Sequence, residues 1–328
     1  MSLVSAAAAT AAPAASGVPD MPDAPAALAV QAVQEALRGL RAPVGVFDAG
    51  IGSYALVRLI QQRCPWQDVI YLADRASFPY GGKTPAELAH AVEAAIAALA
   101  RWGAAAVVLA SNAPSVMVLD AVRPRSPVPV LGVLPPVREA LARSRSGQVA
   151  LLGVASLAGS PQIIDYVARQ AQGRPVRVVN ASPLVELVES GAFLSDPAGT
   201  QALVSDFMQA LRQQQPGLDV CTLSSTHLPW LRPFFEQAAP GLAFLDPAQT
   251  VVDELAARLP APPPEGAAAH AGPADGADGA DGVGRVVCLA TASPAYPLAG
   301  LQDMLARLGV SLPVHAVQVL PAPLPAQL

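Results

Sequence analysis

Charged side chains are scarce in this chain of 328 residues: they make up 14% of it, and the formal net charge is −5. A protein that grips nucleic acid needs a basic face, so this balance argues against nucleic acid as a partner. The chain also lacks a run of 18 or more apolar residues, so we expect no membrane span. The first nineteen residues have no basic region of the kind that opens a signal peptide, and we therefore expect a cytoplasmic protein.

Cysteine is nearly absent, with only Cys64, Cys221 and Cys288. Three scattered cysteines cannot form a disulfide framework, and without a CxxC pair they suggest no metal site. Cys221 and Cys288 fall inside apolar runs, and Cys64 precedes a proline. We therefore expect all three to be buried structural thiols in a reducing compartment.

Two segments lack any apolar period and cannot build a core. Residues 1–24 are rich in alanine and proline, and residues 260–284 repeat proline, glycine, alanine and aspartate. We expect residues 1–41 to be a disordered tail with one short helix over 25–40, and 260–284 to be a flexible insertion. His270, inside the insertion, has no visible partner and is given no function.

The rest of the chain alternates short apolar runs with longer amphipathic stretches. Continuous runs rich in Val, Ile and Leu are typical of parallel strands covered on both faces. The expected strands are 44–48, 68–74, 104–111, 128–133, 148–154, 175–181, 218–225 and 283–291. A helix is expected over 85–102, opened by Pro85 after a Thr84 cap. This alternation predicts an α/β fold with crossover connections.

Polar residues and turn formers follow four of these strands, where ligands bind in α/β sheets. The four segments are 47–53, 73–83, 110–115 and 224–229. The first lacks the GxGxxG spacing of a dinucleotide site, which argues against such a cofactor. The last two are alike, each with a strand that ends in serine and a proline shortly afterwards. They suit the binding of a carboxylate, but ordinary turns have the same composition.

Five segments, in order, resemble the motifs of glutamate racemases of the aspartate/glutamate racemase family. Those enzymes carry FDSGxGG, GDTxxxPYG, ACNTAS, GVIEP and GCTHYP. The matching segments here are FDAGIGS at 47–53, ADRASFPYG at 73–81, ASNAPS at 110–115, GVLPP at 132–136 and SSTHLP at 224–229. Five ordered motifs are far more specific than any single turn.

The resemblance implies two similar Rossmann-like (flavodoxin-like) α/β domains with parallel sheets and a cleft between them. Residues 42–136 with 247–328 would form the first domain, and 137–246 the second. The implied activity is that of an isomerase, an amino-acid racemase that interconverts L- and D-glutamate without a cofactor and supplies D-glutamate for peptidoglycan. The implied partner is a small acidic amino acid, and a homodimer is possible.

In the family, two cysteine thiols act on opposite faces of the substrate, and both positions are serine here. The resemblance places Ser111 at the first thiol and Ser225 at the second. A thiol has a reference pKa near 8.5 and a serine hydroxyl is far less acidic, so removal of an α-proton becomes much harder. We therefore expect lost or strongly reduced racemase activity, as in a pseudoenzyme.

The remaining site candidates also come from the resemblance. With Ser111 and Ser225, the expected catalytic residues are Asp48 and His227. The expected substrate-binding positions are Ala49, Tyr80, Gly81, Asn112, Ala113 and Thr226. Ala49 and Ala113 stand where the family has hydroxyl side chains, and Pro135 stands where it has a glutamate.

Two other readings of the site stay open. Ser111 and His227 could form a nucleophile–base pair, or Ser111, Ser225 or His227 could support altered chemistry on a related acidic substrate. The sequence shows no third group to orient His227, so we expect this side chain only to pack beside or polarise the serine. The alternative to any enzyme is a module that binds a ligand or a protein without turnover.

Overall fold

The computed structural model describes residues 24–78, 80, 83–260 and 283–319, and it describes side chains from residue 28 onward. Most of the expected tail and of the 260–284 insertion, with His270, therefore lies outside the described residues. The expected short helix is present as α1, Ala24–Leu37. No helix among the described residues is long and apolar enough to span a membrane.

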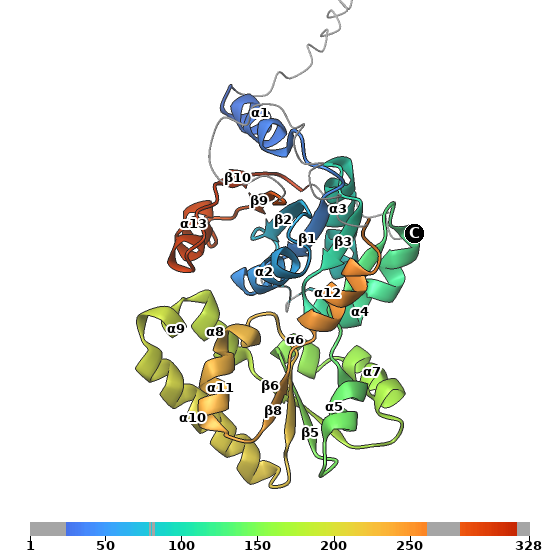
Figure 1. Cartoon of the computed structure of the whole chain (residues 1–328), viewed down its shortest axis with the longest axis vertical. Helices are drawn as coiled ribbons and strands as arrows, with labels where there is room; N and C mark the ends of the chain where they lie inside the picture. Colours follow the sequence, from blue (N-terminus) through green and yellow to red (C-terminus); the bar gives the residue numbers. More distant parts are fainter. Residues whose placement is uncertain (1–23, 79, 81–82, 261–282, 320–328) are drawn as a thin grey trace, which may run out of the picture.

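Two separate parallel sheets form the framework (Figure 1). The first has the order β10-β9-β2-β1-β3-β4, and the second has the order β6-β5-β7-β8. The strands of the first are β1 Val44–Asp48, β2 Val69–Asp74, β3 Ala106–Leu109, β4 Val130–Gly132, β9 Val286–Thr291 and β10 Val314–Ala316. Those of the second are β5 Val149–Gly153, β6 Val176–Asn180, β7 Val220–Leu223 and β8 Ala243–Leu245.

The two sheets share one topology. In each, the first strand of a four-strand unit is flanked by the second and third, and the fourth follows the third, so β2-β1-β3-β4 corresponds to β6-β5-β7-β8. All the strand pairs are parallel. This is the flavodoxin-like order, in which the strand order reverses beside the first strand. The expected α/β class and the pair of similar parallel sheets are confirmed.

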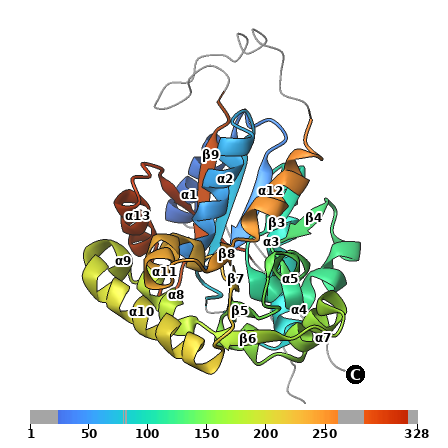
Figure 2. The same cartoon turned by 60° about the horizontal axis from the view of Figure 1, so that its bottom comes forward.

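Helices cover both faces of each sheet, as parallel strands require. On the six-stranded sheet, α2 (Tyr54–Arg63) packs with α12 (Ala248–Ala256), and α3 (Pro85–Arg101) packs with α4 (Asn112–Val122). On the four-stranded sheet, α10 and α11 lie on one side and α5 and α7 on the other (Figures 1 and 2). The remaining helices are α5 Val137–Arg143, α6 Ala155–Ala158, α7 Pro161–Ala171, α8 Ser182–Glu189, α9 Ala192–Ser195, α10 Pro197–Gln214, α11 Arg232–Ala238 and α13 Leu298–Arg307, with 3-10 turns at η1 Ile51–Ser53, η3 Arg123–Arg125 and η4 Leu228–Leu231.

The strand predictions were right in place: the one for β1 matches the observed strand residue for residue, and the other seven extend beyond the strands. Each of the eight expected runs contains one observed strand, but β8 and β10 were missed. Both missed strands are three residues long and lie at a sheet edge. Strand β4 is as short and also lies at an edge, but it is part of the longer apolar run 128–133, which made it predictable. Helix α3 starts at Pro85, and its Thr84 cap is confirmed.

The three cysteines are buried and free, as expected for structural thiols. Burial raises the pKa of the Cys221 thiol and raises that of Cys288 to about 12. Neither thiol is therefore a ready source of thiolate at neutral pH. The division of the chain at residues 42–136 with 247–328, and 137–246, stays a prediction.

Candidate active site

The first half of the site lies at the carboxyl ends of β1 and β3, which are neighbours in the six-stranded sheet. Asp48 ends β1 and is 3% exposed, and Ser111 follows β3 as the residue just before the first turn of α4. Burial raises the pKa of Asp48 to about 6, although the charge of His227, the Ala49 N–H and the Ser111 hydroxyl all act to lower it. A carboxyl group that titrates near neutrality is suited to acid–base work.

The second half comes from the turn after β7 in the other sheet. Thr226 donates a hydrogen bond from Oγ1 to Asp48 Oδ2 at 3.2 Å, so the two sheets meet at this contact. Ser225 and His227 on either side of it are each 6% exposed. Ser225 Oγ lies 3.4 Å from His227 Nδ1. The structure thus pairs His227 with Ser225, whereas the pair considered as an alternative from the sequence was Ser111 with His227.

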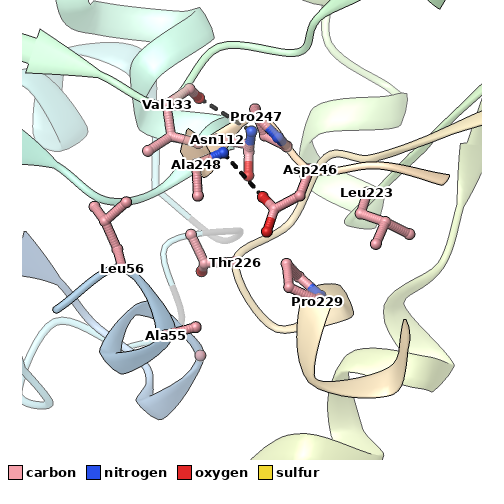
Figure 3. A pocket seen from close by; sticks show the side chains of 11 residues that line it. Ala55, Leu56, Asn112, Val133, Leu223, Thr226, Pro229, Asp246, Pro247 and Ala248 are labelled. Atoms are coloured by element: carbon pink, nitrogen blue, oxygen red, sulfur yellow. Dashed lines mark hydrogen bonds between the residues drawn. The ribbon is translucent and has the colours of Figure 1, made fainter. Parts of the chain in front are cut away.

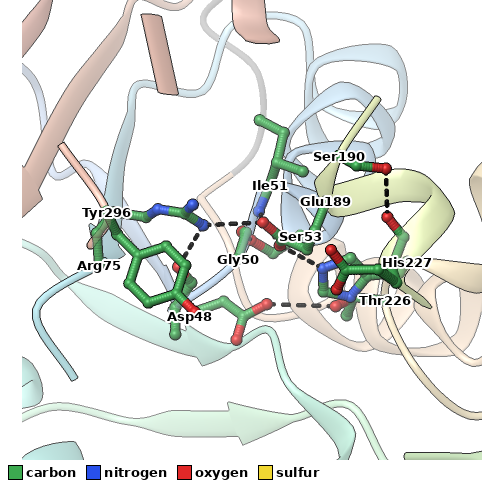
Figure 4. Close-up of polar contacts among 12 residues, drawn as sticks. Asp48, Gly50, Ile51, Ser53, Arg75, Glu189, Ser190, Thr226, His227 and Tyr296 are labelled. Carbon is green, nitrogen blue, oxygen red and sulfur yellow. Dashed lines mark hydrogen bonds and ion pairs between the residues drawn. The ribbon is translucent and has the colours of Figure 1, made fainter. Parts of the chain in front are cut away.

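Glu189, the last residue of α8, fixes the other side of the His227 ring (Figure 4). His227 Nε2 is 2.6 Å from Glu189 Oε1. Burial alone would raise the pKa of Glu189, but hydrogen bonds and charges from His227 and Arg75 outweigh it and bring the pKa to about 2. An ionised carboxylate only accepts, so Nε2 carries the hydrogen of this bond. Burial lowers the pKa of His227, but Glu189 more than reverses this and the net shift is upward.

Glu189 is therefore a third group beside His227 that could not be identified from the sequence. Sequence reasoning missed Glu189 because it lies on an amphipathic helix, 38 residues from His227. One weak signal was available. A carboxylate in the last turn of a helix opposes the helix dipole, so an acidic residue there suggests a specific partner.

Arg75, directly after β2, was also missed as a site residue. Its Nη1 donates to the carbonyl of Ala49 at 3.2 Å and to Glu189 Oε2 at 3.1 Å. The guanidinium carbon lies 5.3 Å from the centre of the Phe78 ring and 5.2 Å from that of Tyr296. Two aromatic faces at this distance hold a guanidinium by cation–π attraction.

Three more of the expected site residues, Tyr80, Ala49 and Ala113, are described by the structure. The Tyr80 hydroxyl donates to Asp74 Oδ2 at 3.5 Å, and the Tyr80 ring packs against Phe47. Ala49 is buried and contributes only its backbone, and Ala113 packs in an apolar cluster. Gly81 lies outside the described residues.

Asn112 faces a small cavity at the junction of the two sheets (Figure 3). Its Nδ2 donates to the carbonyl of Val133 at 3.0 Å, whereas its buried Oδ1 has no hydrogen-bond partner in the described part of the chain. Thr226 and Asp246 also line this cavity, whose volume is about 10 Å³. That is room for about one water molecule. An amino acid could therefore enter here only if the two halves of the molecule, one built on the six-stranded sheet and the other on the four-stranded sheet, moved apart.

No group of three or more His, Cys, Asp or Glu side chains in the described ranges is placed to hold a metal ion. The geometry instead brings together two serines, two carboxylates, an imidazole and a guanidinium. Such a set can bind a carboxylate or an ammonium group, and can move protons between hydroxyl, imidazole and carboxyl groups.

Comparison with known proteins identifies the family of the chain. Residues 53–255 match the family model for Asp/Glu/Hydantoin racemase. The chain is 35% identical over 216 residues to the glutamate racemase of Roseiflexus sp. (strain RS-1), covering 65% of this chain and 78% of that one. It is 32% identical over 212 residues to that of Limosilactobacillus fermentum, covering 64% and 78%.

Solved structures show the same fold. The Escherichia coli glutamate racemase, in complex with L-glutamate and the activator UDP-MurNAc-ala, superposes with a TM-score of 0.69 at 25% identity, covering 85% of this chain and all of that one. The Thermus thermophilus glutamate racemase gives 0.63 at 27% identity, covering 85% and 97%. The chain described here belongs to the Asp/Glu/Hydantoin racemase family.

Proposed function

We propose that this chain is a glutamate racemase homologue that binds a small acidic amino acid between its two sheets and has lost, or nearly lost, two-thiol racemisation. The observation that carries the proposal is a pair of serines, Ser111 and Ser225, at the two positions where glutamate racemases have their thiols. Ser111 hydrogen-bonds Asp48 and Ser225 precedes Thr226, so both serines adjoin the Asp48–Thr226 contact between the two sheets. In this proposal the site lies between a unit of residues 42–136 with 247–328 and a unit of residues 137–246.

The chemical reason is the acidity of the groups. Two-base racemisation needs a base on one face of the α-carbon and an acid on the other, each with a pKa near the working pH. A thiol meets this need and a serine hydroxyl does not. With both thiols replaced, each direction of the reaction lacks its base.

Ligand binding is supported by the charges that the fold keeps at the site. Asp48, Glu189, Arg75 and His227 are buried together and carry both signs of charge, which suits an amino acid with carboxylates and an ammonium group. The structure of the Escherichia coli relative contains L-glutamate. In our proposal the ligand meets Ala49, Tyr80, Gly81, Asn112, Ala113 and Thr226, with Asp48, Ser111, Ser225 and His227 around its α-carbon.

A second candidate function is favoured by one observation, the chain of contacts from Ser225 through His227 to Glu189. A serine, an imidazole and a carboxylate in this order form the arrangement that activates a hydroxyl group. The chain would then be an active enzyme with altered chemistry on a related acidic substrate. Because the pKa of His227 is raised, its basic form and hence this activity would increase with rising pH.

The deciding test is exchange of the α-proton of D- and L-glutamate in D₂O, followed by NMR. We expect no exchange above the buffer rate by the natural chain, and restored exchange by the double variant Ser111→Cys with Ser225→Cys. Exchange by the natural chain that is abolished by Ser225→Ala, and that grows with pH, would instead establish the second candidate.

Binding is tested separately by thermal unfolding with D- and L-glutamate and D- and L-aspartate. A ligand that binds only the folded chain stabilises it by mass action, by about 2.7 kcal/mol at a hundred times its Kd. We expect a rise in Tm with at least one of the four. No rise with any of them would refute the binding of an acidic amino acid.

A further inference from the structure

The carboxylate of Glu189 is bound in the way that a protein binds the carboxylate of a ligand. Its Oε1 accepts hydrogen bonds from the Ile51 backbone N–H at 3.0 Å and from His227 Nε2 at 2.6 Å. Its Oε2 accepts from Arg75 Nη1 at 3.1 Å. Two of these donors, Ile51 in η1 and Arg75 directly after β2, follow strands of the six-stranded sheet. Glu189 and His227 belong instead to the half of the chain that forms the four-stranded sheet.

We propose that Arg75 and the Ile51 N–H form a binding site for a carboxylate of the acidic ligand, and that Glu189 occupies this site in the structure as an internal competitor. The inference rests on the proposed function, because it assumes that an acidic ligand enters between the two sheets. In addition, Arg75 is assigned to one of the ligand's carboxylates, and Glu189 is the group that this carboxylate displaces.

Arg75 is built to bind an anion. The residue is 8% exposed, and its buried Nε has no hydrogen-bond partner among the residues that the structure describes, so the guanidinium has donor capacity that Glu189 does not use. The flanking rings of Phe78 and Tyr296 hold the guanidinium in place, and Figure 4 shows the Tyr296 ring beside it. A fixed, planar guanidinium is the group that best recognises the two oxygens of a carboxylate.

Arg75 also lies where the chain has lost donors. The resemblance places a serine at residue 49 and a threonine at residue 75, and this chain has alanine and arginine there. The Arg75 guanidinium contacts the backbone carbonyl of Ala49, so it reaches the position at which the hydroxyl is missing. The Arg75 guanidinium therefore lies in the part of the site where the resemblance places the hydroxyl groups of residues 49 and 75.

Glu189 can leave this site and still remain paired with His227. Glu189 and His227 are in the same half, so they can move together when the halves separate, whereas Arg75 stays with the six-stranded sheet. A buried arginine without a counter-ion is costly, and an entering carboxylate removes that cost. With its pKa near 2, Glu189 stays ionised and competes across the whole physiological pH range.

The experiment is calorimetric titration of the full chain with L-glutamate and with glutarate. Glu189→Gln removes the competing charge and is expected to lower the Kd about tenfold or more. Arg75→Met removes the cation and is expected to raise the Kd about tenfold or more, by loss of a charge-assisted bond. Glu186→Gln, at an exposed residue of the same helix, is the matched control and should leave the Kd unchanged. Glutaramide, which is uncharged, should not bind more tightly to Glu189→Gln than to the natural chain.

Thermal unfolding shows which variants are folded. If Glu189→Gln does not fold, Glu189→Asp keeps the charge but shortens the side chain away from Arg75, and it is expected to lower the Kd as well. Binding by the natural chain that is unchanged or weaker in both Glu189 variants would overturn this inference and leave the proposed function standing. Failure of the natural chain and of every folded variant to bind either ligand would overturn both.

Discussion

The two carboxyl groups at the centre of the site, Asp48 and Glu189, are both buried, but their pKa values are shifted in opposite directions from the ordinary value. Glu189 has two cationic neighbours, Arg75 and His227, which bring its pKa down to about 2. Asp48 receives hydroxyl and backbone hydrogen bonds and the charge of His227, and burial still brings its pKa up to about 6. The pair therefore divides into one fixed anion and one carboxyl that changes its charge near neutral pH.

Asp48→Asn should stabilise the fold at pH 7.5 and not at pH 4. The pKa of Asp48 is higher in the folded chain than the value of 3.8 expected when unfolded, so the folded state binds protons more tightly. Stability from this group is complete below pH 4 and falls as the pH rises through about 6. We expect a gain of about 2 kcal/mol at pH 7.5 from urea unfolding. Asp120→Asn, at a side chain that is 91% exposed, is the control. An equal gain at both pH values would contradict the burial argument.

Glu189→Gln should destabilise the chain by about 3 kcal/mol at pH 7, because it leaves the buried charges of Arg75 and His227 without their partner. The pKa of Glu189 is lower in the folded chain than when unfolded, so its contribution is present above about pH 4.5 and is lost as the pH falls toward 2. Urea unfolding of the natural chain and the variant at pH 7 and pH 3 measures this. A loss as large at pH 3 as at pH 7 would mean that Glu189 acts by packing and not by charge.

The site residues that the sequence indicated were those at strand ends. Asp48, Ser111, Ser225 and His227 follow apolar runs, and the carboxyl ends of parallel strands converge. Glu189 was missed because it lies on a helix, outside the strand-end segments. Arg75 lies in the strand-end segment 73–83, but its contact with Glu189 joins residues 114 positions apart, so no local pattern indicated its role. Only the packing of the two halves brings them together.

At the scale of elements, helix α3 is defined by its first turn. Thr84 Oγ1 accepts from the Glu87 N–H at 3.3 Å, and Glu87 Oε2 accepts from the Thr84 N–H at 2.8 Å, with Pro85 as the first helical residue. This reciprocal capping box satisfies two backbone donors that the helix cannot pair internally. It explains why the start of α3 could be placed from sequence to the residue.

Thr84→Ala should lower the free energy of unfolding by about 1 kcal/mol, because it removes the cap of α3. Chemical denaturation followed by circular dichroism measures this loss. Thr250→Ala, at an exposed position within α12, removes a threonine hydroxyl without removing a cap, and should cost less than about 0.5 kcal/mol. Equal costs for the two variants would show that the capping box contributes nothing.

Strands were predictable where they lie in a longer run of apolar residues. The first five residues of β2, VIYLA, are all apolar because helices cover both faces of the sheet. Strand β4 is only three residues long, but it lies in the apolar run 128–133. Strands β8 and β10 were not apparent from the sequence, and tertiary pairing with β7 and β9 defines them. Which strands share a sheet is not encoded locally, so only the resemblance suggested it.

The whole molecule is held at its middle by a few close contacts between the two halves. Trp230 Nε1 donates to the carbonyl of Gly52 at 2.9 Å, close to the Thr226–Asp48 contact. Gly52 has no room for a side chain, because a Cβ there would lie 2.6 Å from His227 Cγ and 2.7 Å from the His227 backbone nitrogen. The approach of the halves therefore depends on a glycine at this position.

Gly52→Ala should force the halves apart, because real Cβ atoms do not come within 3.0 Å of backbone atoms. We expect a loss of about 1–3 kcal/mol in the free energy of unfolding and a larger radius of gyration by small-angle X-ray scattering. Gly300→Ala, on helix α13 with open space around it, should leave the radius unchanged and the stability unchanged or higher. An unchanged radius in Gly52→Ala would show that His227 gives way locally.

The strand order has a consequence for synthesis on the ribosome. Strand β9 (286–291) inserts between β2 and β10, so the outer edge of β2 has no partner until residues 286–291 have been made. The four-stranded sheet, whose strands all lie between residues 149 and 245, can close earlier. For that interval the nascent chain exposes an apolar strand edge, the kind of surface that pairs with other chains. Protection by a chaperone would matter most between the synthesis of β8 and that of β9.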